Sequence, residues 1–174
     1  EGTLGRTTAS DVVLVRYLRD AINRLNPNVD VDALEMAIEE ITKDRSSLST
    51  VRANQEIYKL LKDGVPVTYR DEYDEEVDGR VCVIDWKEPS NNSYLMVNQF
   101  WVTGQVYKRR ADIVGFVNGI PLVFMELKAN HKNVADAFNN NLRDYKDTIP
   151  QIFWYNALII LSNGTHSKVG SITS

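Results

Sequence analysis

The chain has 174 residues, a hydrophobic fraction of 43% and a formal net charge of −4. These values are ordinary for one globular domain with a real core, and no apolar run approaches the length of a membrane span. A domain that binds nucleic acid tightly by itself usually carries a basic surface. The acidic balance therefore argues against autonomous binding of that kind, and we expect no membrane partner.

The ends of the chain predict a piece of a larger protein. Glu1 is not an initiator methionine and begins no signal peptide, and Ser174 follows a strand-like stretch without a stop signal. The single cysteine, Cys82, cannot form an internal disulfide, which is consistent with a cytoplasmic protein. We expect one domain over residues 1–174, with a helical layer at 1–64 and a sheet-rich core at 65–174.

Three helices are predicted in the N-terminal layer, because apolar residues recur there at helical spacing. Ser10 or Asp11 is the expected N-cap of the first helix, and Asp30 is the expected N-cap of the second. Gly64 is the expected left-handed stop of the third. The predicted spans are 11–25, 31–44 and 50–62.

Strand patterns dominate after residue 64. An acidic stretch at 71–78 is expected to form a solvated loop, and a helix is expected at 134–145. The apolar run at 157–161 should lie parallel to the strand before that helix, because the helix provides a crossover. The other predicted strands are 65–70, 80–86, 93–107 and 166–172.

The stretch from Arg110 to Ala129 predicts a hairpin that turns at Asn118-Gly119. Its two strands are apolar on both faces, so the hairpin should be central in the sheet and covered on each side. The predicted fold is therefore α/β (α+β), a mixed central β-sheet flanked by helices.

The register of the hairpin decides whether Asp112 and Glu126 share a face. A two-residue loop would pair Asp112 with Met125 and leave Glu126 on the opposite face. A three-residue loop over 117–119, with a left-handed bulge residue, would pair Phe116 with Ile120 and bring the two carboxylates together. We predict the three-residue loop.

Two carboxylates and an amine gathered at a strand end have a chemical interpretation. Asp112 and Glu126 supply hard oxygen ligands for Mg²⁺, with the Leu127 carbonyl as a plausible third ligand. Lys128 can position the attacking water while the metal activates it for hydrolysis of a phosphodiester. The competing interpretation is a half-solvated ion cluster, which contributes about 1 kcal/mol or less to stability.

Asp112, followed after thirteen residues by Glu126-Leu127-Lys128, resembles the PD-(D/E)xK nuclease motif. The surrounding segments are similar, in order, to the N-terminal nuclease domain of type I restriction enzyme R (HsdR) subunits, and the resemblance covers nearly the whole chain. These segments are LNPNVD, LLKDGVPVTYRD, VIDWKEPSNNSYLMVNQFWV, RRADIVGFVNGIPLVFMELKA, AFNNNLRDYKDTIP and NALIILSNGT.

The resemblance implies a restriction-endonuclease-like core with Asp112, Glu126 and Lys128 as catalytic residues. It implies a Mg²⁺-dependent endonuclease that cuts double-stranded DNA after ATP-driven translocation by downstream motor domains. Methyltransferase (M) and specificity (S) subunits would complete the complex. No GxxxxGK[ST] sequence occurs in this chain, so ATP would bind only in the motor domains.

Two positions depart from the family pattern. Ala111 replaces the leading proline of the motif, and Asn141 stands where a glutamine is expected four residues before Tyr145. The resemblance implies that Asn141 and Tyr145 support the site or contact DNA. Some relatives of this nuclease class also use a helical glutamate, for which Glu39 is our candidate, although a solvated acidic helix face is the ordinary interpretation.

Three cations near the motif are candidate DNA contacts. Arg109 and Arg110 lead directly into Asp112, and Lys132 lies where the following helix should begin. Each would bind phosphate and add salt dependence rather than sequence specificity. Two rival functions remain open from the sequence: a repair or recombination nuclease of the same superfamily, and a catalytically silent scaffold module.

Overall fold

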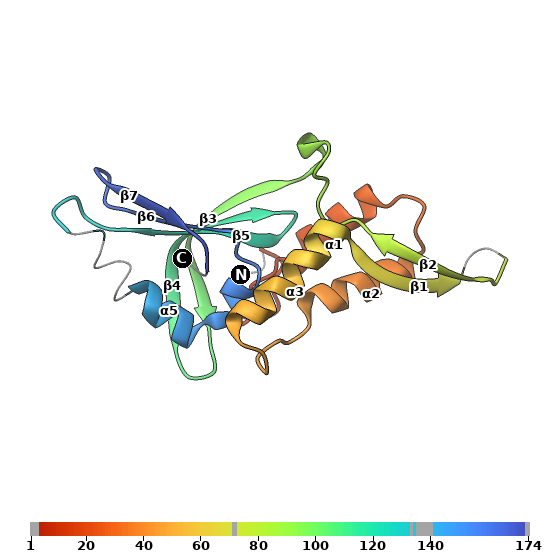
Figure 1. Cartoon of the computed structure of the whole chain (residues 1–174), viewed down its shortest axis with the longest axis horizontal. Helices are drawn as coiled ribbons and strands as arrows, with labels where there is room; N and C mark the ends of the chain where they lie inside the picture. The colour runs from red at the N-terminus through yellow and green to blue at the C-terminus, as the bar shows by residue number, and fades with distance from the viewer. Residues whose placement is uncertain (1–3, 71–72, 133, 135–140, 173–174) are drawn as a thin grey trace.

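The computed structural model describes residues 4–70, 73–132, 134 and 141–172 (Figure 1). A helical layer comes first and a five-stranded sheet follows it. The helices are α1 (Val15–Leu25), α2 (Val31–Thr42), α3 (Thr50–Asp63) and α5 (Arg143–Thr148), with short 3₁₀ turns η1 (Pro89–Asn91) and η3 (Pro150–Trp154). The strands are β1 (Val65–Arg70), β2 (Glu76–Val81), β3 (Tyr94–Thr103), β4 (Lys108–Val117), β5 (Ile120–Leu127), β6 (Leu158–Ser162) and β7 (Ser167–Gly170).

Helix α1 begins at Val15, four residues later than predicted, so the prediction of Ser10 or Asp11 as its cap is wrong. Residues 11–14 pass beneath the β4–β5 turn instead, where the Leu14 amide donates to the Gly119 carbonyl at 2.9 Å. Leu14 is fully buried there. Burying apolar side chains of this segment against the hairpin stabilises the fold more than a further helical turn would. The segment therefore does not become helical despite its helical spacing.

The predicted N-cap of α2 and the predicted stop of α3 are confirmed, although α2 ends at Thr42 rather than at residue 44. The Asp30 carboxylate accepts a hydrogen bond from the Asp32 amide at 2.8 Å, as an N-cap does. Gly64 ends α3 with φ 81°. Within the described residues, no helix combines the length and the apolar character that crossing a lipid bilayer requires.

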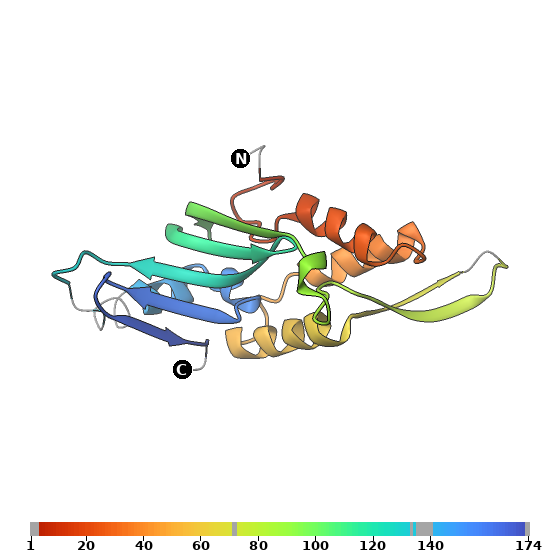
Figure 2. The ribbon, with the colours of Figure 1, turned by 90° about the horizontal axis from the view of Figure 1, so that it is seen from above.

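The large sheet has the strand order β3-β4-β5-β6-β7, with the hairpin of β4 and β5 in its interior as predicted. Strand β6 runs parallel to β5 and every other neighbouring pair is antiparallel, so the sheet is mixed. Strands β1 and β2 form a separate two-stranded ribbon that projects beyond the helices (Figure 2).

Three predicted strand boundaries are wrong. Strand β2 ends at Val81 rather than continuing to residue 86, because residues 85–92 fold into a loop around the Asp85 and Asn92 side chains. It begins at Glu76, inside the predicted acidic loop. Strand β3 ends at Thr103, because the Gly104 amide donates to the Tyr107 carbonyl and closes a turn into β4.

The β4–β5 turn has two residues, so the predicted three-residue loop is wrong. Val117 pairs with Ile120, and both turn residues, Asn118 and Gly119, have positive φ (50° and 80°). Turns of this geometry match the twist of the flanking strands. The buried Asn118 side chain fixes the turn, because its Oδ1 accepts from the Ser93 amide at 2.7 Å.

A bulge in β5 then restores the alignment that the turn alone would have lost. Phe116 pairs with Pro121, but Gly115 pairs with Val123, so Leu122 is an extra residue. The pairing continues to Ile113 and Met125. The pairing ends there, and this register, if continued by one step, would place position 112 opposite position 126.

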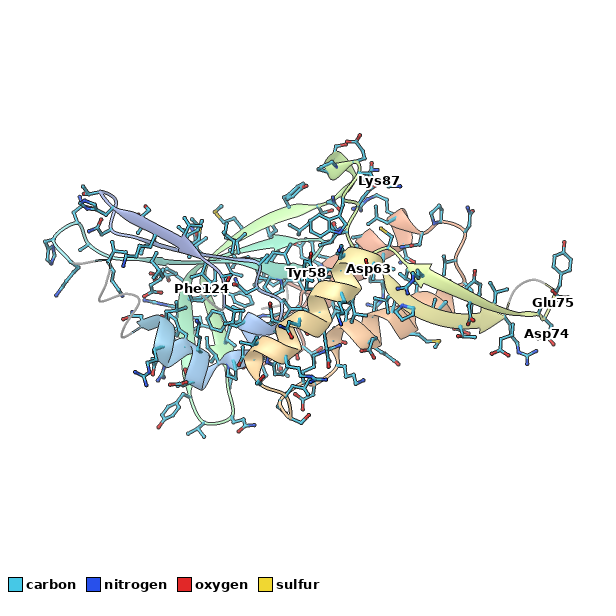
Figure 3. The ribbon with its side chains drawn as sticks, in the orientation of Figure 1. Tyr58, Asp63, Asp74, Glu75, Lys87 and Phe124 are labelled. Atoms are coloured by element: carbon cyan, nitrogen blue, oxygen red, sulfur yellow. The ribbon has the colours of Figure 1, made fainter. Side chains whose placement is uncertain are left out.

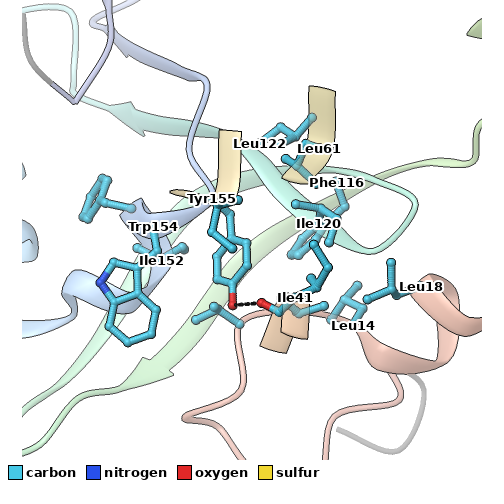
Figure 4. Close-up of a cluster of buried hydrophobic side chains, with 14 of the residues drawn as sticks. Leu14, Leu18, Ile41, Leu61, Phe116, Ile120, Leu122, Ile152, Trp154 and Tyr155 are labelled. Atoms are coloured by element: carbon cyan, nitrogen blue, oxygen red, sulfur yellow. Dashed lines mark hydrogen bonds between the residues drawn. The ribbon is translucent and has the colours of Figure 1, made fainter. Parts of the chain in front are cut away.

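One face of the sheet packs on the helices, and the core lies there (Figure 4). Tyr155 shows how closely the two layers meet, because its hydroxyl donates to the Ile41 carbonyl at the end of α2 at 2.9 Å. Among the described elements no helix covers the opposite face (Figure 2), where Met96 is 65% exposed and Val169 is 66% exposed. The prediction that both faces are covered therefore fails for the described part of the chain.

Gly119 offers a test of the turn. Its φ is +80°, and an added Cβ would lie 2.5 Å from the Leu14 carbonyl oxygen. We expect Gly119→Ala to lower the free energy of unfolding by about 2 kcal/mol in urea titrations. Gly79→Ala is the control, because its φ is ordinary and its Cβ meets only the ring edge of Tyr69 at 3.2 Å. Equal effects of the two variants would contradict the description of the turn.

Candidate functional site

Asp112 lies where β4 and β5 stop pairing. The last paired residues are Ile113 and Met125. Beyond them the Asp112 carboxylate accepts a hydrogen bond from the Leu127 amide, with 2.8 Å between Oδ2 and N. The side chain of Asp112 thus bridges the diverging strands and lies next to the Glu-Leu-Lys segment of β5.

Glu126 is almost completely buried, at 2% exposed. Its Oε1 accepts from Nζ of Lys128 at 2.9 Å and from Nδ2 of Asn141 at 2.6 Å. Its Oε2 is buried and accepts no hydrogen bond from the residues that the structure describes. A buried carboxylate oxygen without a partner is costly, so it is expected where a ligand supplies the missing contact.

Lys128 is held at both of its ends. Its amide donates to the Ser162 carbonyl of β6 at 2.8 Å, while its Nζ bonds to Glu126. The side chain is 22% exposed, so the ammonium group lies between the buried carboxylate and solvent. A lysine in this position can reach a water or phosphate oxygen beside Glu126.

Asn141 and Tyr145 approach the same carboxylates from the segment that contains α5. The Asn141 amide reaches Glu126, although the sequence pattern led us to expect the longer glutamine here. The Tyr145 hydroxyl donates to the Arg110 carbonyl at 3.1 Å, and its ring meets Phe124 edge-on at 5.5 Å. Burial, followed by the negative charges of Glu126 and Asp112, raises the pKa of Tyr145, so its phenol stays protonated.

The predicted helix at 134–145 is described only in part, since residues 135–140 lie outside the described residues. Its described portion, α5, continues to Thr148. Arg109 anchors α5 to β4 through two bonds to Asp144, with Nε–Oδ2 at 2.6 Å and Nη2–Oδ1 at 3.0 Å. The Arg109 guanidinium also holds the pKa of the Asp144 carboxyl below its usual value.

The other predicted DNA contacts have different surroundings. Arg110 is exposed and lies over the ring of Trp101, and Lys132 is exposed near the end of the β5 segment. In the described part of the chain, Arg109 is the one of the three that pairs with a carboxylate. Asp144, the partner of Arg109, was not identified from sequence. The two residues are separated by 34 others in the chain, and only the folded structure brings them together.

Among the described residues, no third acidic side chain joins Asp112 and Glu126. Within the described ranges, no three His, Cys, Asp or Glu side chains gather closely enough to hold a metal. Glu39 is exposed on α2, which packs against α1, β1 and β2. The structure thus does not bring Glu39 to the site, and the ordinary interpretation of a solvated helix face holds.

The residues present nevertheless suit a hard divalent cation. Asp112 bonds to the amide that follows Glu126, and Oε2 of Glu126, which has no hydrogen-bond partner among the described residues, is an available oxygen ligand. Mg²⁺ prefers one or two protein carboxylates together with water and substrate phosphate. The arrangement can therefore hold a metal, activate water and bind a phosphate at the open end of the hairpin.

Comparison with known families matches residues 1–174 to the family described as the type I restriction enzyme R protein N terminus (HSDR_N). The chain is similar to the "Type I restriction enzyme HindI endonuclease subunit" of Haemophilus influenzae, with 37% identity over 177 residues covering 100% of this chain and 17% of that protein. It is also similar to the "Putative type I restriction enzyme MjaIXP endonuclease subunit" of Methanocaldococcus jannaschii, with 30% identity covering 97% of this chain and 16% of that protein. The chain thus spans about a sixth of the length of these relatives.

Proposed function

Since the chain belongs to the family of type I restriction enzyme R protein N termini, we propose that it is a Mg²⁺-dependent endonuclease domain acting on double-stranded DNA. The observation that carries this proposal is the buried Oε2 of Glu126, which accepts no hydrogen bond from the described residues although Asp112 lies close by. A purely structural ion pair would be expected to use both oxygens of so deeply buried a carboxylate.

Asp112, Glu126 and the Leu127 carbonyl would hold the ion. A Mg²⁺ ion bound there would supply Lewis-acid activation of water and neutralise the charge that develops on phosphorus. Lys128 would orient the attacking water and stabilise the phosphate oxygens, because its Nζ already lies 2.9 Å from Glu126 Oε1. Asn141 Nδ2 bonds to the same Glu126 oxygen and helps to hold the carboxylate in place.

The remainder of the longer protein would deliver DNA to this site. We propose that downstream motor domains bind ATP and translocate DNA in the cytoplasm, and that M and S subunits supply sequence recognition. The acidic charge of this chain supports a module that other domains carry to DNA. Membership of the restriction family favours this role over a repair or recombination nuclease.

Lys128→Met tests the proposal in the full-length subunit within its complex. The variant keeps much of the side chain's length but removes the ammonium group, so we expect DNA cleavage to fall about a hundredfold. ATP hydrolysis should stay unchanged, because the motor lies in other domains. Lys87→Met, in an exposed loop residue, is the control and should cleave normally (Figure 3). Normal cleavage by Lys128→Met would instead support the scaffold alternative.

A further inference from the structure

One indole side chain and two cationic side chains form a cluster on the paired strands β3 and β4 of the large sheet. Trp101 pairs with Arg110 across the two strands. The guanidinium carbon of Arg110 lies 5.6 Å from the centre of the Trp101 ring, and Nζ of Lys108 lies 5.0 Å from it. We call Trp101, Lys108 and Arg110 the ribbon patch.

No carboxylate of the described residues forms an ion pair with the two cations of the ribbon patch. Neither Lys108 nor Arg110 forms an ion pair with an acidic residue in the described part of the chain, whereas Arg109 between them pairs with Asp144. Both cations are exposed, and Trp101 is 42% exposed. On a chain of net charge −4, such a cluster is a local positive potential that attracts an anion.

The cluster faces away from the core. Phe100, Val102 and Ala111, the neighbours of Trp101 and Arg110 along the two strands, are buried. Because side chains alternate along a strand, the ribbon patch lies on the outer face of this part of β3 and β4. The Trp101 ring holds both cations there through cation–π contacts, which leaves their charge available to a ligand.

The two cations of the ribbon patch lie close to Asp112 along β4. Arg110 and Lys108 precede Asp112 by two and four residues on β4. At about 3.3 Å per strand residue, these positions lie roughly 7 and 13 Å from Asp112. Both cations therefore lie a short distance along β4 from Asp112, within reach of the phosphates of a DNA strand bound there.

We infer that the ribbon patch binds the phosphate backbone of the DNA strand that enters the Asp112–Glu126 site. This inference rests on the proposed nuclease function and specifies where its substrate lies. Lys108 and Arg110 bind phosphates on one side of the scissile bond, and Trp101 keeps the two cations in register with the DNA strand. Phosphate contacts of this kind position DNA without reading its sequence.

A chemical footprint tests the contact without requiring cleavage. In the full-length subunit carrying Asp112→Asn, lysine acetylation is measured by mass spectrometry with and without duplex DNA. We expect DNA to slow acetylation of Lys108 several-fold, and to slow it less at high salt. Lys62 is the internal control, because it lies 5.9 Å from the Tyr58 ring on α3, in the same kind of cation–π pair but on a different element (Figure 3). Equal acetylation of Lys108 with and without DNA would overturn the inference.

Cleavage by the double variant Lys108→Gln/Arg110→Gln provides the second measurement, with Lys62→Gln as the matched control. Per ATP hydrolysed, the double variant should cleave roughly tenfold less at 0.15 M salt. The slope of the logarithm of its DNA-binding constant against the logarithm of salt concentration should be smaller in magnitude by about 1.8 for two lost contacts. A lower thermal stability with an unchanged slope would mean that the cluster only stabilises the ribbon, and would overturn the inference. Residual cleavage by Asp112→Asn would count against the proposed function alone, because the Lys108 footprint is independent of cleavage.

Discussion

Glu126→Gln should reduce DNA cleavage about a thousandfold while leaving the protein folded. The substitution keeps the shape of the side chain but removes the charge that would hold a divalent cation. Loss of several kcal/mol of metal-derived stabilisation of the transition state corresponds to such a factor. The measurement is the rate of duplex cleavage by the full complex, with ATP hydrolysis as the internal reference.

Stability separates the catalytic role of Glu126 from a structural one. Glu126 is buried with one oxygen unpartnered among the described residues, whereas Lys128 can remain partly solvated when its partner is lost. The free energy of unfolding should therefore stay within about 1 kcal/mol of the parent, or rise. A loss of about 3–5 kcal/mol would indicate a structural ion pair broken in the interior. Met96→Leu, an exposed residue of β3, is the control for both assays.

Phe124→Ala should cause the largest loss of stability among these variants, about 3–5 kcal/mol. Phe124 is 1% exposed, and its ring lies 5.5 Å from that of Tyr145 and 5.1 Å from that of Phe153. Its position between the sheet and the helical side is visible in Figure 3. Truncation leaves a cavity where β5 meets the segment that carries the site's supporting residues. Urea unfolding of the parent and the variant gives the difference.

Phe124→Ala should also reduce DNA cleavage by more than its loss of folding stability explains. Tyr145 would lose its ring contact, so the segment that holds Asn141 against Glu126 would be less well fixed. Leu122→Ala is the matched control, because it removes a buried side chain from the same strand at the bulge. Cleavage at the parent rate in Phe124→Ala, under conditions where it is folded, would show that α5 does not position the site.

Local chemistry predicted much of this fold. Asn118-Gly119 specified the hairpin because both residues tolerate positive φ. The apolar run in β6 predicted a parallel neighbour of β5, and the Asp30 cap set the start of α2. The turn and the cap depend on residues close together in the chain, and the parallel pairing follows from the predicted helical crossover between the two strands.

The alignment of the two carboxylates was predicted for an incorrect reason. A three-residue loop was expected to bring Asp112 beside Glu126, but a two-residue turn and a bulge at Leu122 produce that alignment. A bulge depends on packing across the sheet, and its one local signal, Pro121 inside an interior strand, does not specify Leu122 as the extra residue. Distant pairs such as Arg109 with Asp144 escaped prediction for the same reason, because tertiary structure creates them.

Iron-directed cleavage of the polypeptide tests the metal site most directly. Fe²⁺ placed in the site, with ascorbate and peroxide, should cut the backbone of the full-length subunit beside Asp112 and beside Glu126-Leu127-Lys128, and excess Mg²⁺ should suppress those cuts. Glu126→Gln should lose them. Absence of cuts at these positions, or identical cuts in Glu126→Gln, would contradict a metal held between Asp112 and Glu126.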